Sequence, residues 1–241
     1  MLKSLFLYTL AAGLVIFSGC KNDKKDKDDE NGSGKTEENG FKNSGFQYSP
    51  DKPYAYEEGI IKYKFTGSYE GTHIEYFSDN GKVRRIDNDY INKATPTQER
   101  VHEVYIFRDD KMIYYDLNTK SGYERPLNDT LTKGNINEDI INLGIDSAMS
   151  RHKYKKTDDQ VIQGNRCEVY VSQNGESRFC FHEGINIQTV MNYGQQVKYT
   201  LEATDIDTKN PKVDDDLFTV PGGIRILTFN QWVKENTKDR L

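Results

Sequence analysis

Apolar and polar residues alternate along most of the chain after residue 57, in short runs that end at turn-forming residues. A period of two places successive side chains on opposite faces of a pleated strand, so the pattern indicates half-buried β-strands. An Asn-Gly pair at residues 80–81 is typical of a tight hairpin. The strands are expected at residues 59–66, 72–77, 83–87, 101–107, 111–117, 122–126, 166–171, 177–182, 185–192 and 195–206.

Residues 138–150 change the period from two to three or four, which predicts one amphipathic helix. Asn137 is expected to cap it. Thr228 and Gln231 have the spacing of a capping box, which predicts a short C-terminal helix. The fold class expected is therefore mainly β (α+β): a curved antiparallel sheet or half-barrel, with one amphipathic helix packed on it and a short C-terminal helix. Residues 46–241 form this single domain.

The N-terminus has the pattern of an export signal. Lys3 precedes an apolar run at residues 5–17, which is shorter than the roughly 20 residues that a membrane-spanning helix needs. Small residues and Cys20 follow the run. This arrangement resembles the bacterial lipobox, although Phe17 occupies a position where that family usually has Leu, Val or Ile. The resemblance implies a signal peptide at residues 1–19 and acylation of Cys20.

Residues 20–45 are rich in Lys, Asp, Glu, Asn and Gly and contain a single bulky apolar residue. Such a segment cannot bury enough apolar surface to order itself, so it is expected to be a flexible tether. Residues 27–30 (KDDE) resemble the export signal of surface-exposed Bacteroidota lipoproteins. We therefore expect an outer-membrane, lipid-anchored protein displayed on the cell surface, with an anchor that faces the periplasm as the alternative.

Composition argues against a nucleic-acid-binding protein and against a wholly disordered chain. The formal net charge of −5 gives no general attraction for nucleic acid. Sixteen Tyr and eleven Phe argue against a wholly disordered chain and suit strands with one wet face.

Two cysteines remain in the expected domain, and an even pair in an exported chain suggests a disulfide between Cys167 and Cys180. Two hairpin registers are open. A two-residue loop at 174–175 pairs Val169 with Cys180 and leaves the cysteines diagonal, at about 7–8 Å, which is too far for easy bridging. A four-residue loop at 172–175 places them directly opposite. No nucleophile signature surrounds either cysteine.

Other chemistry has little support in the sequence. The four histidines lack zinc-ligand spacing; they are His73, His102, His152 and His182. Asp205 and Asp207 match the start of an EF-hand calcium loop. The match ends at Lys209 and Asn210, where that loop needs an Asp or Asn followed by a Gly. No phosphate loop or nucleophile elbow is present. We expect no cofactor, no metal site, no catalytic residue and no enzymatic activity.

Four segments, taken together, resemble bacterial envelope proteins with a DUF4412-type domain, near the LolA/LolB/RseB-like fold group. They are GIIKY at 59–63, GTHIEYFSDNGK at 71–82, Ile162-x-Gly164-x-x-Cys167-x-x-Tyr170, and Asp216-x-Phe218-x-Val220-Pro221-x-Gly223. The resemblance implies a half-barrel with a helical cover over an apolar cavity, and no functional residue can be transferred.

Two functions follow as hypotheses. The first is a non-enzymatic module that binds a lipid, a lipidated peptide or another apolar or amphiphilic ligand between sheet and helix. The second is a surface interaction or structural lipoprotein with a filled core, accessory to an uptake or envelope complex. The sequence does not identify the ligand-binding residues or a protein partner.

Overall fold

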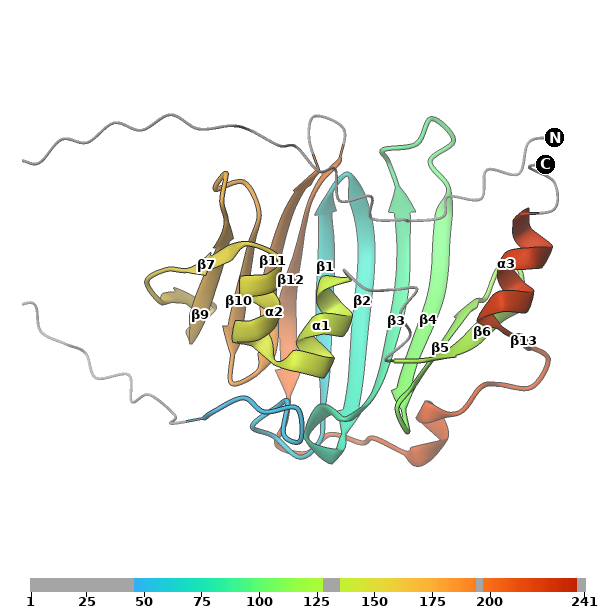
Figure 1. Cartoon of the computed structure of the whole chain (residues 1–241), viewed down its shortest axis with the longest axis horizontal. Coiled ribbons are helices and arrows are strands. Elements are labelled where there is room, and N and C mark those ends of the chain that lie inside the picture. The colour runs from blue at the N-terminus through green and yellow to red at the C-terminus, as the bar shows by residue number, and fades with distance from the viewer. Residues whose placement is uncertain (1–45, 128–134, 194–196, 238–241) are drawn as a thin grey trace, which may run out of the picture.

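A computed structural model describes residues 46–127, 135–193 and 197–237. One strongly curved sheet of 13 strands dominates this part of the chain (Figure 1). The sheet is open and almost entirely antiparallel, as the sequence predicts. Three α-helices accompany it in the described residues, one of them the predicted short C-terminal helix. The expected signal peptide, Cys20 and the expected tether lie outside the described residues. Within those residues, no helix is long and apolar enough to cross a membrane.

The elements follow one another in a simple order. They are β1 (Gly59–Gly67), β2 (Tyr69–Ser78), β3 (Val83–Asn92), β4 (Arg100–Arg108), β5 (Lys111–Asp116), β6 (Ser121–Pro126), α1 (Ile136–Leu143), α2 (Ile145–Arg151), β7 (Tyr154–Lys156), β8 (Gln160–Ile162), β9 (Asn165–Ser172), β10 (Arg178–His182), β11 (Ile185–Tyr193), β12 (Val197–Asp207), β13 (Arg225–Thr228) and α3 (Phe229–Thr237).

The first strand lies in the middle of the sheet. From β1, the strands β2 to β6 follow as neighbours in chain order, and β13 adds to β6 as a parallel edge. On the other side β1 pairs with β12. The strands β11, β10, β9 and β7 then follow as neighbours, in the reverse of their order in the chain. Two meanders are therefore joined along the β1–β12 pair, which connects residues far apart in sequence.

The expected helix is present, but Gly144 divides it into α1 and α2. Gly144 has φ +87° and ψ 161°, a conformation outside the helical region that only glycine adopts readily. The expected cap was wrong by two residues: Asn135, not Asn137, caps α1 and accepts hydrogen bonds from the next turn. Period-three spacing continues across the break, so the pattern alone gave no sign of it.

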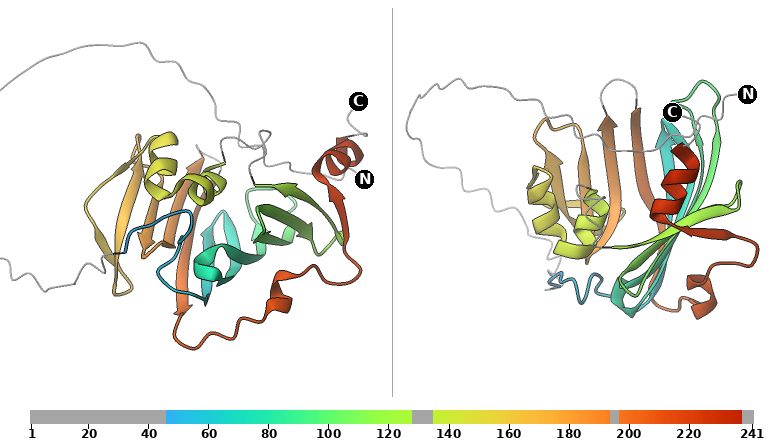
Figure 2. Two further views of the ribbon diagram at one scale, coloured as in Figure 1. Left: turned by 60° about the horizontal axis from the view of Figure 1, so that its bottom comes forward. Right: turned by 45° about the vertical axis from the view of Figure 1, so that its right-hand side comes forward.

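Both helices lie on the concave face (Figures 1 and 2), and in Figure 1 α2 stands in front of β10 and β11, with α1 nearer the middle of the sheet. Ile136, Ile145 and Met149 pack there against strand side chains. The strand partners are aromatic or flexible and all buried: Tyr170, Phe179, Phe181 and Met191. Burial of these apolar surfaces holds the helix pair on the sheet. Side chains therefore fill this helix–sheet interface, where the family resemblance implied an apolar cavity.

The convex face of the other half is covered by the segment between β12 and β13. Phe218 from this segment is buried against Val104, Ile106 and Tyr115. The chain then reaches α3, whose capping box is confirmed: Gln231 Oε1 accepts from the Thr228 backbone N–H at 3.1 Å. β13 was not predicted, because its four residues carry no alternation that separates them from a loop.

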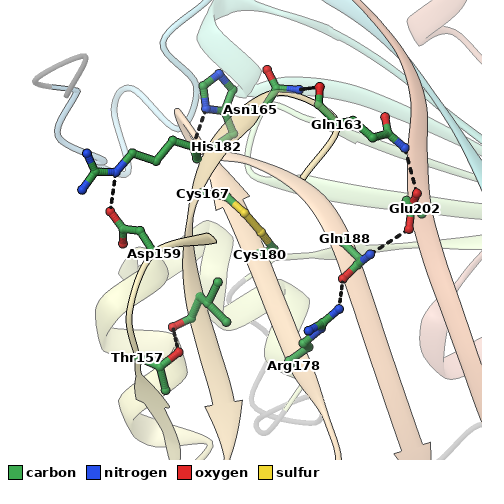
Figure 3. The surroundings of a disulfide bond; sticks show 12 residues. Thr157, Asp159, Gln163, Asn165, Cys167, Arg178, Cys180, His182, Gln188 and Glu202 are labelled. Carbon is green, nitrogen blue, oxygen red and sulfur yellow. Dashed lines mark hydrogen bonds and ion pairs between the residues drawn. A yellow bond between two sulfur atoms is a disulfide. The ribbon is translucent and has the colours of Figure 1, made fainter. Parts of the chain in front are cut away.

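Figure 3 shows the Cys167–Cys180 disulfide, which joins β9 to β10. The register pairs Val169 with Cys180, so the two cysteines are diagonal, yet their Cα atoms lie only 5.5 Å apart. Our expectation that this register is too wide for easy bridging was wrong. In the pairing of β10 with β11 a bulge lies between Cys180 and Phe181. Bulges increase the local twist of a strand, and twist brings one diagonal of a hairpin closer.

Candidate functional site

A cleft lies where the α1–α2 junction, the ends of β9 and β10 and the N-terminal segment meet. Its volume is about 770 Å³, within the range of small-molecule sites. Three chain segments that are distant in sequence line it: residues 46–50, residues 143–147 and residues 156–184. Phe46, the first residue that the structure describes, is among the lining residues.

One part of the lining is apolar and aromatic. Phe46, Tyr48, Leu143, Ile145 and Phe181 contribute to it. Tyr48 is held in place because its hydroxyl donates to the Ile140 carbonyl at 2.6 Å. Leu143 is 36 % exposed, one of few large apolar side chains so exposed in the described residues. The cleft therefore presents apolar surface to solvent beside the packed helix interface.

The other part of the lining carries charge of both signs. Lys156 pairs with Glu168 at 2.9 Å. Arg166 Nε pairs with Asp159 at 2.9 Å (Figure 3). These pairs are partly solvent-exposed, so each adds little to stability. They form a polar rim with donors and acceptors beside the apolar wall.

Tyr170 connects the rim to α2. Its hydroxyl donates to Asp146 Oδ1 at 2.5 Å and lies 3.3 Å from Glu168 Oε2. Burial raises the pKa of Tyr170, and the hydrogen bond to Asp146 raises it further. The Lys156 ammonium lies 5.6 Å from the centre of the same ring, in cation–π range. Tyr170 is therefore a neutral donor that orders the polar side of the cleft.

A second polar group crosses the concave face at β2, β3 and β4. His73 Nδ1 lies 2.7 Å from Asn88 Oδ1, and the Asn88 amide donates to Glu103 Oε1 at 3.2 Å. Burial lowers the pKa of His73 to about 4, so the ring is neutral at physiological pH. Burial also raises the pKa of Glu103 to about 7, with a smaller contribution from Asp116.

A third polar group fixes the N-terminal segment to the sheet. The buried hydroxyl of Tyr54 donates to Glu75 Oε1 at 2.6 Å and accepts from Arg84 Nη1 at 3.2 Å. The Arg84 guanidinium also lies 5.2 Å from the centre of the Phe107 ring. Because buried polar groups are costly unless they are paired, these hydrogen bonds hold the N-terminal segment on the sheet.

The histidines singled out from the sequence are not brought together. His73 lies on the concave face, while His152 contacts Asp139 at 2.8 Å after α2. His182 Nδ1 lies 2.8 Å from the Arg166 carbonyl, and His102 lies on β4. In the described parts of the chain, no three His, Cys, Asp or Glu side chains are placed to hold a metal ion.

The acidic residues behind the calcium interpretation have structural contacts instead. Asp205 pairs with Lys62 at 3.0 Å. Asp207 Oδ1 accepts from the backbone N–H groups of Lys209 and Asn210, each at 3.3 Å, and so closes a turn.

Sequence reasoning missed the residues of the cleft and of the concave face. The cleft combines segments far apart in the chain, and no local pattern indicates that they meet. Glu103 carried a usable signal, because it shares the parity of the inward-facing Tyr105 and Phe107 on β4. An acidic residue at a position where the alternation predicts an apolar one indicates a polar side chain that faces the core.

Comparison with known proteins does not place the chain in a family. No family model matches it, and no curated protein matches it. Among solved structures, an uncharacterized conserved protein from Thermus thermophilus is similar with a TM-score of 0.47 and 8 % identity, covering 74 % of this chain and 94 % of that one. LprF from Mycobacterium bovis gives 0.34 and 10 %, covering 68 % and 90 %. MucB, in its complex with MucA(peri), gives 0.34 and 6 %, covering 74 % and 58 %.

At TM-scores below 0.5 and identities of 10 % or less, these likenesses assign neither a ligand nor a partner to the chain. The conclusion that the structure itself carries is that this chain is an open, curved antiparallel sheet with a helix pair on its concave side and a cleft at the end of that pair.

Proposed function

We propose that the protein is a non-enzymatic envelope module that binds an amphiphilic ligand, such as a lipid or a lipidated peptide, in the cleft beside α1 and α2. The observation that carries this proposal is the two-sided lining of the cleft. Apolar side chains stand on one wall and charged side chains on the other, around a volume of about 770 Å³. A ligand with an apolar part and a polar head matches both walls.

The proposed cleft differs from the one implied by the family resemblance. The interior between helices and sheet is occupied by buried side chains such as Met149 and Phe179. A ligand would therefore bind at the margin of the helix pair, with its apolar part against Leu143 and Phe181. Its polar head would contact Lys156, Arg166 or the Tyr170 hydroxyl.

The N-terminal pattern completes the proposal. Cleavage before Cys20 and acylation of that residue would anchor the protein in the outer membrane, facing either outward or into the periplasm. Residues 21–45 would then hold the cleft near the bilayer, since a flexible chain of this length reaches roughly 25–30 Å. A cleft close to the membrane would meet amphiphiles at high local concentration.

The test places a large side chain in the cleft by substitution of a residue of α2. Ser147 is exposed and lines the cleft, whereas Ser150 is exposed on the same helix and does not line it. We expect Ser147→Trp to weaken binding of a fluorescent fatty acid about tenfold or more, because the indole occupies the apolar wall. Ser150→Trp should bind as the wild type does. Fluorescence titration of the purified full-length proteins measures both affinities.

Equal weakening by both variants, or by neither, contradicts the cleft as the binding site. Failure of the wild type to take up the fatty acid, together with absence of co-purified lipid in native mass spectrometry, contradicts ligand binding altogether. That outcome favours the second function, an interaction or structural lipoprotein, for which the filled helix–sheet interface is the supporting observation.

A further inference from the structure

Two acidic side chains face each other on the concave side of β4 and β5. Glu103 and Asp116 are direct partners in the antiparallel register. Their side chains share a face with Tyr105 and Tyr114, because residues two apart on a strand point the same way. Like charges directly opposite one another in a sheet are destabilising. The pair is therefore a feature that needs a compensating positive charge or a proton.

No basic side chain of the described residues forms an ion pair with either acid. Asp116 Oδ1 accepts from the backbone N–H groups of Asn118 and Thr119, at 2.6 and 3.3 Å. Glu103 receives the neutral amide of Asn88 and the neutral hydroxyl of Tyr105. Both acids are thus positioned by neutral donors, and their charge is left uncompensated.

Aromatic rings stand beside the pair. Tyr105 and Tyr114 have ring centroids 5.2 Å apart, and Tyr114 and Tyr123 repeat that spacing on the next strand. These three rings form a continuous row, the tyrosine row, which runs from β4 to β6 on the concave face. Trp232 of α3 ends the row, 5.0 Å from the Tyr123 centroid and 6.4 Å from that of Tyr114. The three rings are partly exposed, and on their other side they pack against the cluster of Phe107, Met112 and Leu127.

We propose that the concave face binds an organic ammonium ligand, a primary to quaternary amine, with its positive charge between Glu103 and Asp116 and its carbon substituents on the tyrosine row. Carboxylates supply the counter-charge. The faces of the tyrosine rings attract a cation through their quadrupoles, and this attraction strengthens where water is excluded. The site is separate from the cleft and does not depend on the function proposed for it.

The surroundings favour an organic cation over a metal ion. Calcium and magnesium require six or more oxygen ligands. Here Asn88 turns its amide nitrogen, a donor, toward Glu103, and the flanking side chains are aromatic. An ammonium group instead uses few acceptors and gains from ring faces.

Trp232 gives a direct readout, because it is the single tryptophan of the chain and contacts two rings of the row. The experiment titrates the full-length protein with choline and follows Trp232 fluorescence. A parallel titration uses neohexanol, the uncharged isostere of choline. We expect a saturable change with choline and none with neohexanol at the same concentrations.

Three variants test the contributions of the charge and of the Tyr114 ring. Glu103→Gln keeps size and hydrogen bonding but removes the charge, and should weaken choline binding about tenfold. Tyr114→Leu should weaken it similarly, whereas Tyr114→Phe, which keeps the ring face, should not. The fluorescence spectrum without ligand confirms that each variant is folded around Trp232.

Binding should also weaken as the pH falls below about 7, because protonated Glu103 offers no counter-charge. The titratable groups that face it are Asp116 and Tyr114 on β5, Tyr123 on β6, Tyr105 on its own strand, and His73 through Asn88. Near neutral pH the Glu103 carboxyl is about half protonated, and the His73 ring is already neutral. The tyrosines stay protonated because burial raises their pKa values.

Equal affinity for choline and neohexanol would overturn the proposal, because the row would then bind apolar groups without regard to charge. Unchanged affinity in Glu103→Gln, or no saturable signal in the folded wild type, would also overturn it. The absence of a saturable signal would mean that a proton alone neutralises the pair of Glu103 and Asp116. None of these outcomes bears on the fatty-acid titration of Ser147→Trp, so the two proposals fail separately.

Discussion

At the scale of single residues, the concave face holds two half-buried titratable groups, His73 and Glu103, whose pKa values shift in opposite directions. Asn88 connects them, since it contacts His73 through its oxygen and Glu103 through its nitrogen. Burial disfavours the charged form of each group, which lowers the pKa of the imidazole and raises that of the carboxyl. Both groups therefore favour the neutral state, and their effects on stability oppose each other.

The pH dependence of stability follows from these directions. A raised carboxyl pKa means that the stability contribution of Glu103, complete below its unfolded value of about 4.5, is lost as the pH rises through about 7. The lowered pKa of His73 means that its contribution is present above about 6.5 and is lost as the pH falls through about 4. In the wild type the two slopes partly cancel between these limits.

Glu103→Gln should remove the part of the pH dependence of stability that the Glu103 carboxyl causes. We expect the variant to be more stable than the wild type by up to about 3 kcal/mol near pH 8, and to match it near pH 4. Urea denaturation at both pH values measures the difference. Glu99→Gln, at an exposed position, controls for loss of a surface charge. A stabilisation of equal size at both pH values would show that ionisation of Glu103 is not its cause.

At the scale of elements, alternation of apolar and polar residues predicted the long strands and the sheet class. The short elements β7 and β8 were missed, because three residues do not establish a period. The β3 strand extends to Asn92, further than expected, because partners on β2 and β4 pair with its polar end. Backbone pairing decides such ends, and the side-chain pattern does not report it.

The division of the helix at Gly144 gives a second prediction. Gly144→Ala should destabilise the protein by about 2–3 kcal/mol, because φ there is +87° and a Cβ would lie 3.1 Å from the Tyr48 ring. Gly175→Ala is the matched control, since φ is +74° but nothing lies within 4 Å of its Cβ. It should cost only about 1–2 kcal/mol. Thermal unfolding compares them, and equal losses would exclude a role for the Tyr48 contact.

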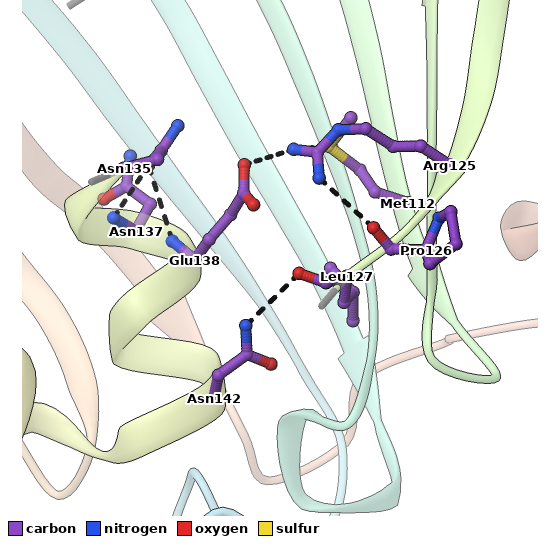
Figure 4. Close-up of polar contacts among 8 residues, drawn as sticks. All are labelled: Met112, Arg125, Pro126, Leu127, Asn135, Asn137, Glu138 and Asn142. Atoms are coloured by element: carbon purple, nitrogen blue, oxygen red, sulfur yellow. Dashed lines mark hydrogen bonds and ion pairs between the residues drawn. The ribbon is translucent and has the colours of Figure 1, made fainter. Parts of the chain in front are cut away.

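At the scale of the whole molecule, α1 connects the two halves of the sheet across the concave side. Its apolar residues pack with the β9–β11 half, while Glu138 forms an ion pair with Arg125 of β6 in the other half (Figure 4). Asn142 adds a hydrogen bond to the Leu127 carbonyl. The Arg125 and Glu138 side chains are 3 % and 8 % exposed, so this ion pair is buried.

A double-mutant cycle tests this connection. Arg125→Met should cost about 3–5 kcal/mol, because it leaves a buried carboxylate without its partner. Adding Glu138→Leu should restore most of that loss, since no buried charge then remains. The exposed pair Arg225–Glu235 is the control, and Arg225→Met should cost less than about 1 kcal/mol. Additive losses in the double variant would show that the two groups do not interact.

The position of β1 in the centre of the sheet has a consequence for how the chain reaches this structure. Of the described strands of the sheet, β1 is synthesised first and β12 is among the last, yet they are neighbours. Strands β1 to β6 can pair in order as they emerge, while the open edge of β1 must wait for residues 197–207. Closure of so long a loop is entropically costly and slows folding. During that interval β1 offers an unpaired edge to other chains, so the nascent protein is most prone to aggregate just before its last long strand arrives.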